Sequence, residues 1–123
     1  DLSVALITNG TLTRRINPDI WNMLEWVRVS INVFPMWELK IKLPLEHFNG
    51  KTVIGSSFCY DEDYDMDIMR SVSTIASRLN AQYVRLLPNC LLPQDELLKR
   101  HEKVNGVITE LGDPRFFHQF KIQ

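Results

Sequence analysis

The side chains that most often carry out covalent or metal chemistry are sparse in this sequence of 123 residues. Cys59 and Cys90 have no second cysteine or histidine near them, which does not match the spacing of zinc ligands or of a disulfide framework. His47, His101 and His118 also stand far apart in the sequence and suggest no catalytic triad or metal site. We therefore interpret the two cysteines as reduced, buried thiols.

An acidic run from Asp61 to Asp67 is the next candidate for a metal site. A calcium-binding loop needs a glycine at its sixth position and a glutamate at its twelfth, and this run has neither. Carboxylates also favour the first turn of a helix, where they interact with the helix dipole. A solvent-exposed helix start accounts for the run better.

Small polar residues at the ends of hydrophobic runs are more informative. Thr8-Asn9-Gly10 ends the first run and, taken alone, is typical of a simple turn in which Gly10 takes a positive φ. Ser30 and Asn32 end the second run and project on the same side, because side chains alternate along a strand. Burying such groups without partners costs about 1–3 kcal/mol each, so the pair indicates a polar ligand.

The elements that must position these groups follow from the hydrophobic pattern. Runs rich in β-branched residues predict four strands, near 4–8, 26–32, 52–60 and 83–88. Apolar residues at helical spacing predict three helices, near 18–25, 65–79 and 94–111. Prolines interrupt the stretch 34–50, which we expect to be mostly loop.

Strands that alternate with helices predict an α/β fold with about four parallel strands joined by right-handed crossovers. Both a doubly wound sheet and part of a barrel agree with this alternation. In either case functional residues gather at the carboxyl ends of the strands. The length of the chain leaves room for a single domain over residues 1–123.

Composition narrows the classes of partner. Fourteen Lys and Arg against fifteen Asp and Glu give a formal charge of -1, so no broad field attracts nucleic acid or an anionic membrane. No stretch reaches the ~20 apolar residues of a membrane span, and the first residues do not resemble a signal peptide. We therefore expect a cytoplasmic protein with no membrane partner, and the balance of charge disfavours, without excluding, a nucleic-acid partner.

The order of these motifs resembles the radical S-adenosylmethionine (radical SAM) enzymes. The strand that ends in Thr8-Asn9-Gly10, a helix, and the strand Trp26-Val27-Arg28-Val29-Ser30-Ile31-Asn32 resemble the third and fourth strands of that family. The strand 52–60, with its Gly55, is similar to the fifth strand, and Tyr83-Val84-Arg85-Leu86-Leu87-Pro88 to the sixth. The resemblance covers nearly the whole chain. It implies part of a radical SAM type partial (β/α) barrel, a partial TIM barrel.

The resemblance also implies a cofactor and a reaction. In the family, strand ends hold S-adenosyl-L-methionine against an iron–sulfur [4Fe-4S] cluster, so the intact protein would be metal-binding. One electron from the reduced cluster then releases a 5′-deoxyadenosyl radical, which takes a hydrogen atom from the substrate. The family therefore predicts that this chain orients the cofactor and excludes solvent around it.

Roles for single residues follow from the same resemblance. Thr8 and Asn9 fall where the third-strand turn of the family lies near the methionine and ribose end of the cofactor. Ser30 and Asn32 fall where the fourth strand hydrogen-bonds the ribose or the carboxylate. These four residues would hold the polar end of S-adenosylmethionine.

The adenine end would lie against the last two predicted strands. Gly55 to Ser57 match a fifth-strand stretch that runs beside adenine, and Leu87 matches the sixth-strand end that flanks it. Arg85 could bind a carboxylate through its guanidinium group, or point outward as a solvated strand residue. Both orientations of Arg85 agree with strand alternation.

The sequence departs from the family in its cysteines. The motif Cys-x3-Cys-x2-Cys, which follows the first strand of the family, is absent here, and two isolated cysteines cannot ligate a cluster. We therefore expect a piece of a larger enzyme that has no metal ligands or catalytic residues of its own and is inactive alone. Its expected partners are the missing remainder of the barrel or a partner chain, and an unknown substrate.

A non-catalytic α/β binding or assembly module that kept the scaffold is the alternative interpretation. A Cys-x3-Cys-x2-Cys motif upstream in the parent gene would favour the enzyme. A doubly wound nucleotide-binding domain ranks last, because no Gly-x-Gly-x-x-Gly follows any predicted strand. The tail 113–121 resembles the passage by which some family members leave the barrel, with Phe116-Phe117 as a docking anchor.

Overall fold

The computed structural model describes residues 4–8, 10, 13–31, 41–60, 66–88 and 93–118, with the backbone alone at Pro88 and His118. The strands are β1 Ala5–Thr8, β2 Trp26–Ile31, β3 Val53–Tyr60, β4 Tyr83–Pro88 and β5 Phe116–His118. The helices are α1 Pro18–Met23, α2 Met66–Arg78 and α3 Gln94–Leu111, with short 3₁₀ turns η1 Thr13–Arg15 and η3 Leu45–His47. All four predicted strands and all three predicted helices are present, within two residues of their predicted bounds.

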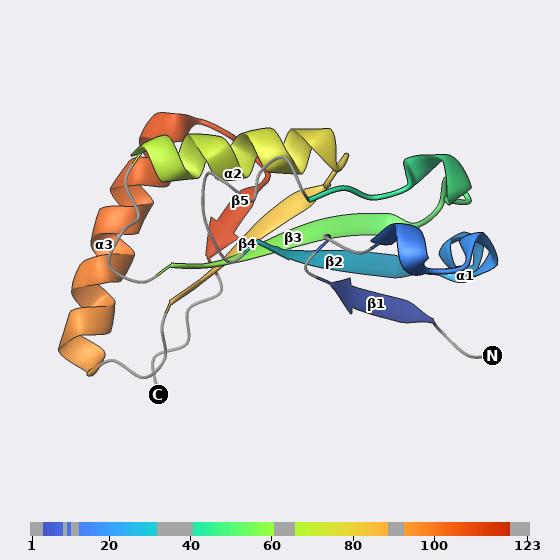
Figure 1. Ribbon diagram of the computed structural model, residues 1–123. Helices are drawn as coiled ribbons and strands as arrows, with labels where there is room; N and C mark the ends of the chain where they lie inside the picture. Colours follow the sequence, from blue (N-terminus) through green and yellow to red (C-terminus); the bar gives the residue numbers. More distant parts are fainter. Residues whose placement is uncertain are drawn as a thin grey trace.

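The five strands form one sheet in the order β1-β2-β3-β4-β5, and every neighbouring pair is parallel. The prediction of an α/β fold with a parallel sheet is confirmed. A doubly wound sheet reverses its strand order at a switch point. In this sheet the strand order follows the chain order without reversal, as Figure 1 shows.

The fifth strand corrects the prediction of about four strands. Phe116-Phe117 is not only an anchor for the tail, because residues 116–118 pair in register with β4. Gly112 ends α3 in the left-handed conformation, and the chain then turns back within a few residues to begin β5. Such a short strand is defined by its pairing and gives almost no periodicity in the sequence.

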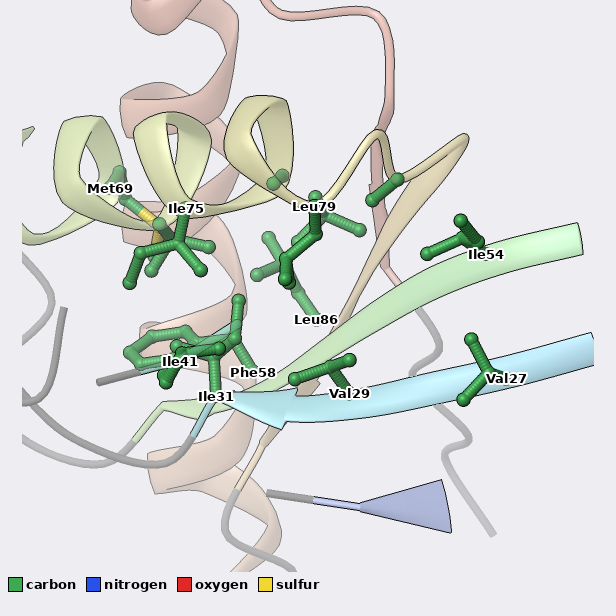
Figure 2. Close-up of a cluster of buried hydrophobic side chains, with 14 of the residues drawn as sticks. Val27, Val29, Ile31, Ile41, Ile54, Phe58, Met69, Ile75, Leu79 and Leu86 are labelled. Atoms are coloured by element: carbon green, nitrogen blue, oxygen red, sulfur yellow. The ribbon is translucent and has the colours of Figure 1, made fainter. Parts of the chain in front are cut away.

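One face of the sheet carries the hydrophobic core. Val27, Val29 and Ile31 of β2 are at most 2% exposed and share this face with the core residues of β3 and β4. The apolar stripe of α2, which includes Met69 and Ile75, packs onto them, as Figure 2 shows. Because side chains alternate along each strand, the residues between these core positions point to the opposite face.

The opposite face, called here the open face, contributes none of the buried hydrophobic residues among those described. Alternate residues of the described strands form it: Ala5, Ile7, Trp26, Arg28, Ser30, Val53, Gly55, Ser57, Cys59, Tyr83, Arg85, Leu87 and Phe117. Ile7 is 60% exposed and Phe117 is 43% exposed. Figure 1 shows α2 lying over the other side of the sheet. The sheet is therefore covered by described helices on one side only.

Candidate functional site

Three polar side chains form a row across the middle of the open face. The register pairs Ser30 of β2 with Ser57 of β3, and Ser57 with Arg85 of β4. Paired residues of parallel neighbours lie about 4.8 Å apart across the sheet and point to the same side. Ser57 is buried, while Ser30 and Arg85 are half-buried. This row, called here the serine–arginine row, offers two hydroxyls and one guanidinium group to a ligand on the open face.

The row before it carries one aromatic ring and a second guanidinium group, and further aromatic rings lie in the adjacent rows. Arg28, Gly55 and Tyr83 are paired across β2, β3 and β4, and a Cβ atom on Gly55 would overlap the Tyr83 ring. Gly55 is thus the position that lets Tyr83 lie flat across the sheet. Arg28 Nε donates to Tyr83 Oη at 3.4 Å, and the Arg28 guanidinium carbon is 5.3 Å from the centre of the Trp26 ring. The Tyr83 and Phe117 ring centroids are 5.9 Å apart.

The charge of the open face follows from its residue types. Its two charged side chains are Arg28 and Arg85, and none of the described strand residues that form it is acidic. A guanidinium group binds a carboxylate or phosphate through two parallel hydrogen bonds, and aromatic rings stack on a base or another planar group. The open face is therefore suited to a ligand that combines an anionic group, hydroxyls and a flat ring.

Most of the predicted site residues come together on this face. Ser30, Ser57 and Arg85 form the serine–arginine row, and Gly55 lies in the row before it. Leu87 also points to the open face, paired with Cys59 one row nearer the carboxyl ends of the strands. Predicted residues Asn9 and Asn32 lie outside the described residues.

Thr8 is not on the open face. It pairs with Val29, a core residue, so its side chain points to the helix-covered side. Its hydroxyl Oγ1 accepts a hydrogen bond from the Gly10 backbone N–H at 3.1 Å, and Gly10 has a φ of 76°. In the structure Thr8 stabilises the turn after β1, which is the simpler role considered for Thr8-Asn9-Gly10.

Cys59 corrects the prediction of two buried thiols. It is exposed, because it lies on the open face where no described helix covers it. Cys90 lies outside the described residues. Within the part of the chain that the structure describes, no group of three or more His, Cys, Asp or Glu side chains is placed to hold a metal ion. That this chain supplies no cluster ligand stays a prediction.

Arg28, Tyr83 and Trp26 were not among the residues singled out from the sequence. Strand alternation contained the necessary signal, because Arg28 precedes Ser30 by two positions and Tyr83 precedes Arg85 by two. Alternation within a strand does not give the register between strands. In the structure this register pairs both Arg28 and Tyr83 with Gly55, which lies between them.

Comparison of the chain with protein-family models, curated proteins and solved structures found no match. None of the helices in the described residues has the length and apolar character needed to cross a membrane.

Proposed function

We propose that this chain is the cofactor-holding part of a radical SAM enzyme and that S-adenosylmethionine binds to the open face. The observation that carries the proposal is the serine–arginine row, three polar side chains in register across neighbouring parallel strands. A sheet face that no helix covers can carry polar side chains where a bound ligand packs against it and supplies their hydrogen-bond partners. The strand motifs that resemble the family supply the identity of the ligand.

The winding of the sheet supports the barrel form of this proposal. In a (β/α) barrel, strands are added in chain order and the helices cover the outer side, which leaves the inner side for ligands near the carboxyl ends. The order β1-β2-β3-β4-β5 and the single helix-covered face agree with such an arrangement. The open face would then be the inner side of a partial barrel.

The residues of the open face fit the parts of S-adenosylmethionine. The Arg85 guanidinium would bind the carboxylate, and the Ser30 and Ser57 hydroxyls would hydrogen-bond the ribose. Tyr83, one row before the serine–arginine row, offers an aromatic surface to the adenine ring. When it is bound beside a reduced [4Fe-4S] cluster, this cofactor supplies hydrogen-atom abstraction. The residues of this chain would orient the cofactor and keep water away from it.

Cluster ligands would come from elsewhere in the assembled enzyme. We propose that a Cys-x3-Cys-x2-Cys segment, in the same polypeptide or in a partner chain, completes the site. Because the cluster itself binds the amino and carboxylate groups of the cofactor in this family, the 123-residue chain should bind S-adenosylmethionine only weakly. Anaerobic reconstitution of the chain with iron and sulfide should yield no stoichiometric cluster, and a four-iron signal would contradict this assignment.

Titration followed by ¹⁵N NMR tests the proposal, because amide shifts detect binding as weak as millimolar. S-adenosylmethionine should shift the amides of Ser30, Ser57 and Arg85 and leave those of α2 unchanged. Ser57→Ala and Arg85→Gln should each weaken binding about fivefold to tenfold. The matched controls Ser71→Ala and Arg70→Gln lie on α2 and should have no effect.

Two outcomes would contradict the proposal. Shifts that spread over the molecule, or equal losses in the α2 controls, would show non-specific binding. An absence of shifts at millimolar S-adenosylmethionine would favour the non-catalytic α/β binding or assembly module. For that alternative, the open face would bind another macromolecule and the serine–arginine row would be part of an interface.

A further inference from the structure

A small cleft lies away from the open face, within the layer that covers the other side of the sheet. Its volume is about 240 Å³, and it is lined by Thr13, Arg14, Lys42, Leu43, Pro44 and Arg78. These residues come from three separate segments: the 3₁₀ turn η1, the segment 41–44, and the last residue of α2. Residues far apart in the chain therefore meet around one small space.

Two of the three segments are fixed to each other by hydrogen bonds. Thr13 Oγ1 donates to the Lys42 carbonyl oxygen at 2.7 Å, and Thr13 itself is only 3% exposed. The Lys42 backbone N–H donates to the Gly10 carbonyl oxygen at 2.9 Å. A Cβ atom on Gly10 would lie 2.8 Å from Ile41 Cγ2, so the backbone at Gly10 packs closely against this segment. The walls formed by η1 and residues 41–44 thus hold a defined geometry.

The charged residues that the structure describes around this cleft are all cationic. Arg14, Lys42 and Arg78 line it, and none of the carboxylates that the structure describes does so. Within the described residues the Arg14 and Lys42 side chains form no ion pair. Like charges that converge on a small space repel one another, and a bound anion removes that repulsion. Arg14 and Lys42, which form no ion pair within the described residues, therefore favour an anionic ligand in this cleft, and Arg78, which also has another interaction, adds to the positive charge beside them.

We infer that this cleft binds the phosphate group of a small phosphorylated molecule. An arginine guanidinium matches phosphate oxygens with paired hydrogen bonds, and a lysine ammonium adds a point charge. Pockets for drug-sized ligands occupy roughly 300–1,000 Å³, so this smaller cleft suits a compact ligand. Leu43 and Pro44 offer a short apolar wall to the carbon skeleton beside the phosphate. This site lies outside the proposed cofactor surface and does not depend on it.

The test is a titration of the 123-residue chain with inorganic phosphate, followed by calorimetry and amide NMR at constant ionic strength. We expect one saturable site, with amide shifts at Thr13, Arg14, Lys42 and Arg78. Arg14→Gln and Lys42→Gln should each weaken phosphate binding about tenfold, because each removes one charge-assisted contact. Both side chains are exposed and each change removes like-charge repulsion, so the temperature of thermal unfolding without phosphate should stay the same or rise slightly.

The chain offers a matched control for each variant. Arg15→Gln removes the same charge one residue away, and Lys51→Gln does so on another exposed lysine, yet neither residue lines the cleft. These controls should change the affinity less than about twofold, because only screened, longer-range charge is lost. Binding that never saturates, or losses as large in Arg15→Gln and Lys51→Gln as in the cleft variants, would overturn the inference. Glycerol phosphate should compete with inorganic phosphate for the site, and a failure to compete would also overturn it.

Discussion

Two buried hydroxyl groups near β3 differ in whether they have a hydrogen-bond partner. Ser56 is fully buried among core residues, and its Oγ has no hydrogen-bond partner in the described structure. An unsatisfied buried hydroxyl is destabilising, so its removal should not weaken the fold. We expect Ser56→Ala to leave the free energy of unfolding unchanged or to raise it by about 1 kcal/mol, as measured by urea denaturation.

Thr52 provides the contrast for this prediction. Its Oγ1 is buried and donates to the Leu24 carbonyl oxygen at 2.8 Å. Thr52→Val keeps the shape of the side chain but leaves that carbonyl without this donor, so it should lower the free energy of unfolding by about 1 kcal/mol. Equal destabilisation by Ser56→Ala would mean that the Ser56 hydroxyl has a bound water or another partner.

Gly55 and Tyr83 should be energetically coupled. A methyl group on Gly55 would push the Tyr83 ring away from Arg28 and Phe117. We expect Gly55→Ala to destabilise the fold by about 1 kcal/mol. In a Tyr83→Ala background the same change should be neutral or stabilising, because alanine lowers the entropy of the unfolded strand relative to glycine. A double-mutant cycle measured by urea unfolding checks this, and additive effects would contradict it.

At the residue scale, face assignment within one strand could be predicted and register between strands could not. Alternation within a strand relates Arg28 to Ser30 and Tyr83 to Arg85, whereas it left both orientations of Arg85 relative to the sheet open. Thr8 was grouped with Ser30 because it also ends a strand. It pairs with Val29 and not with Ser30, and a shift of one residue moves a side chain to the other face.

At the scale of elements, an ion-paired network attaches α2 to the turn before β5. Arg115 Nε donates to Asp113 Oδ1 at 3.0 Å, and its Nη2 donates to Asp113 Oδ2 at 2.7 Å. Ser73 of α2 donates to the same carboxylate at 2.7 Å. The hydrogen bonds from Arg115 are the main reason that the pKa of Asp113 falls from 3.8 to about 2. This network holds β5 in position beside β4.

The Asp113 network predicts a pH dependence of stability. Because the pKa of Asp113 is depressed in the folded chain, ionised Asp113 stabilises the fold above pH 4, and that contribution disappears as the pH falls toward 2. Asp113→Asn should therefore cost about 1 kcal/mol at pH 7, and the difference from the unchanged chain should shrink between pH 4 and 2. The exposed Asp67→Asn is the control and should change the free energy of unfolding at pH 7 by much less. If the stability lost in Asp113→Asn stayed constant down to pH 2, ionised Asp113 would not be the source of the stabilisation.

The long elements could be predicted because each carries its own periodicity. The helix α3 begins and ends at the predicted residues, with Gly112 as its left-handed C-cap. β5 has only three residues, and its place depends on Asp113, Arg115 and β4. Contacts of this kind between distant elements leave no local pattern in the sequence.

At the scale of the whole molecule, the sheet has two unpaired edges among the described strands. β1 pairs only with β2 and β5 only with β4. Natural proteins usually cover, charge or pair such edges, and β1 is almost wholly apolar, with Ile7 60% exposed. We expect the purified chain to self-associate, as measured by sedimentation, and the β1 amides to exchange hydrogen rapidly in the monomer.

Ile7→Lys places a charge at this edge and should reduce the association. Ile20→Lys on α1 makes the same change at a residue that is 43% exposed and should have little effect. A stable monomer with strongly protected β1 amides would contradict the expectation that β1 pairs with a further strand.

The alternation of strands and helices could be predicted from the sequence at the scale of the whole molecule. The order of the strands in the sheet could not, because no single βα unit specifies the side on which the next strand is added.

The agreement of strand order with chain order has a consequence for synthesis. Each strand from β2 onward pairs with the segment that left the ribosome just before it, so no strand has to wait for a partner encoded much later. Each pair of neighbouring strands is separated along the chain by a single crossover segment, so no pairing has to close a loop longer than one unit. The sheet can therefore grow one unit at a time during translation, because each new strand is added at the edge opposite β1.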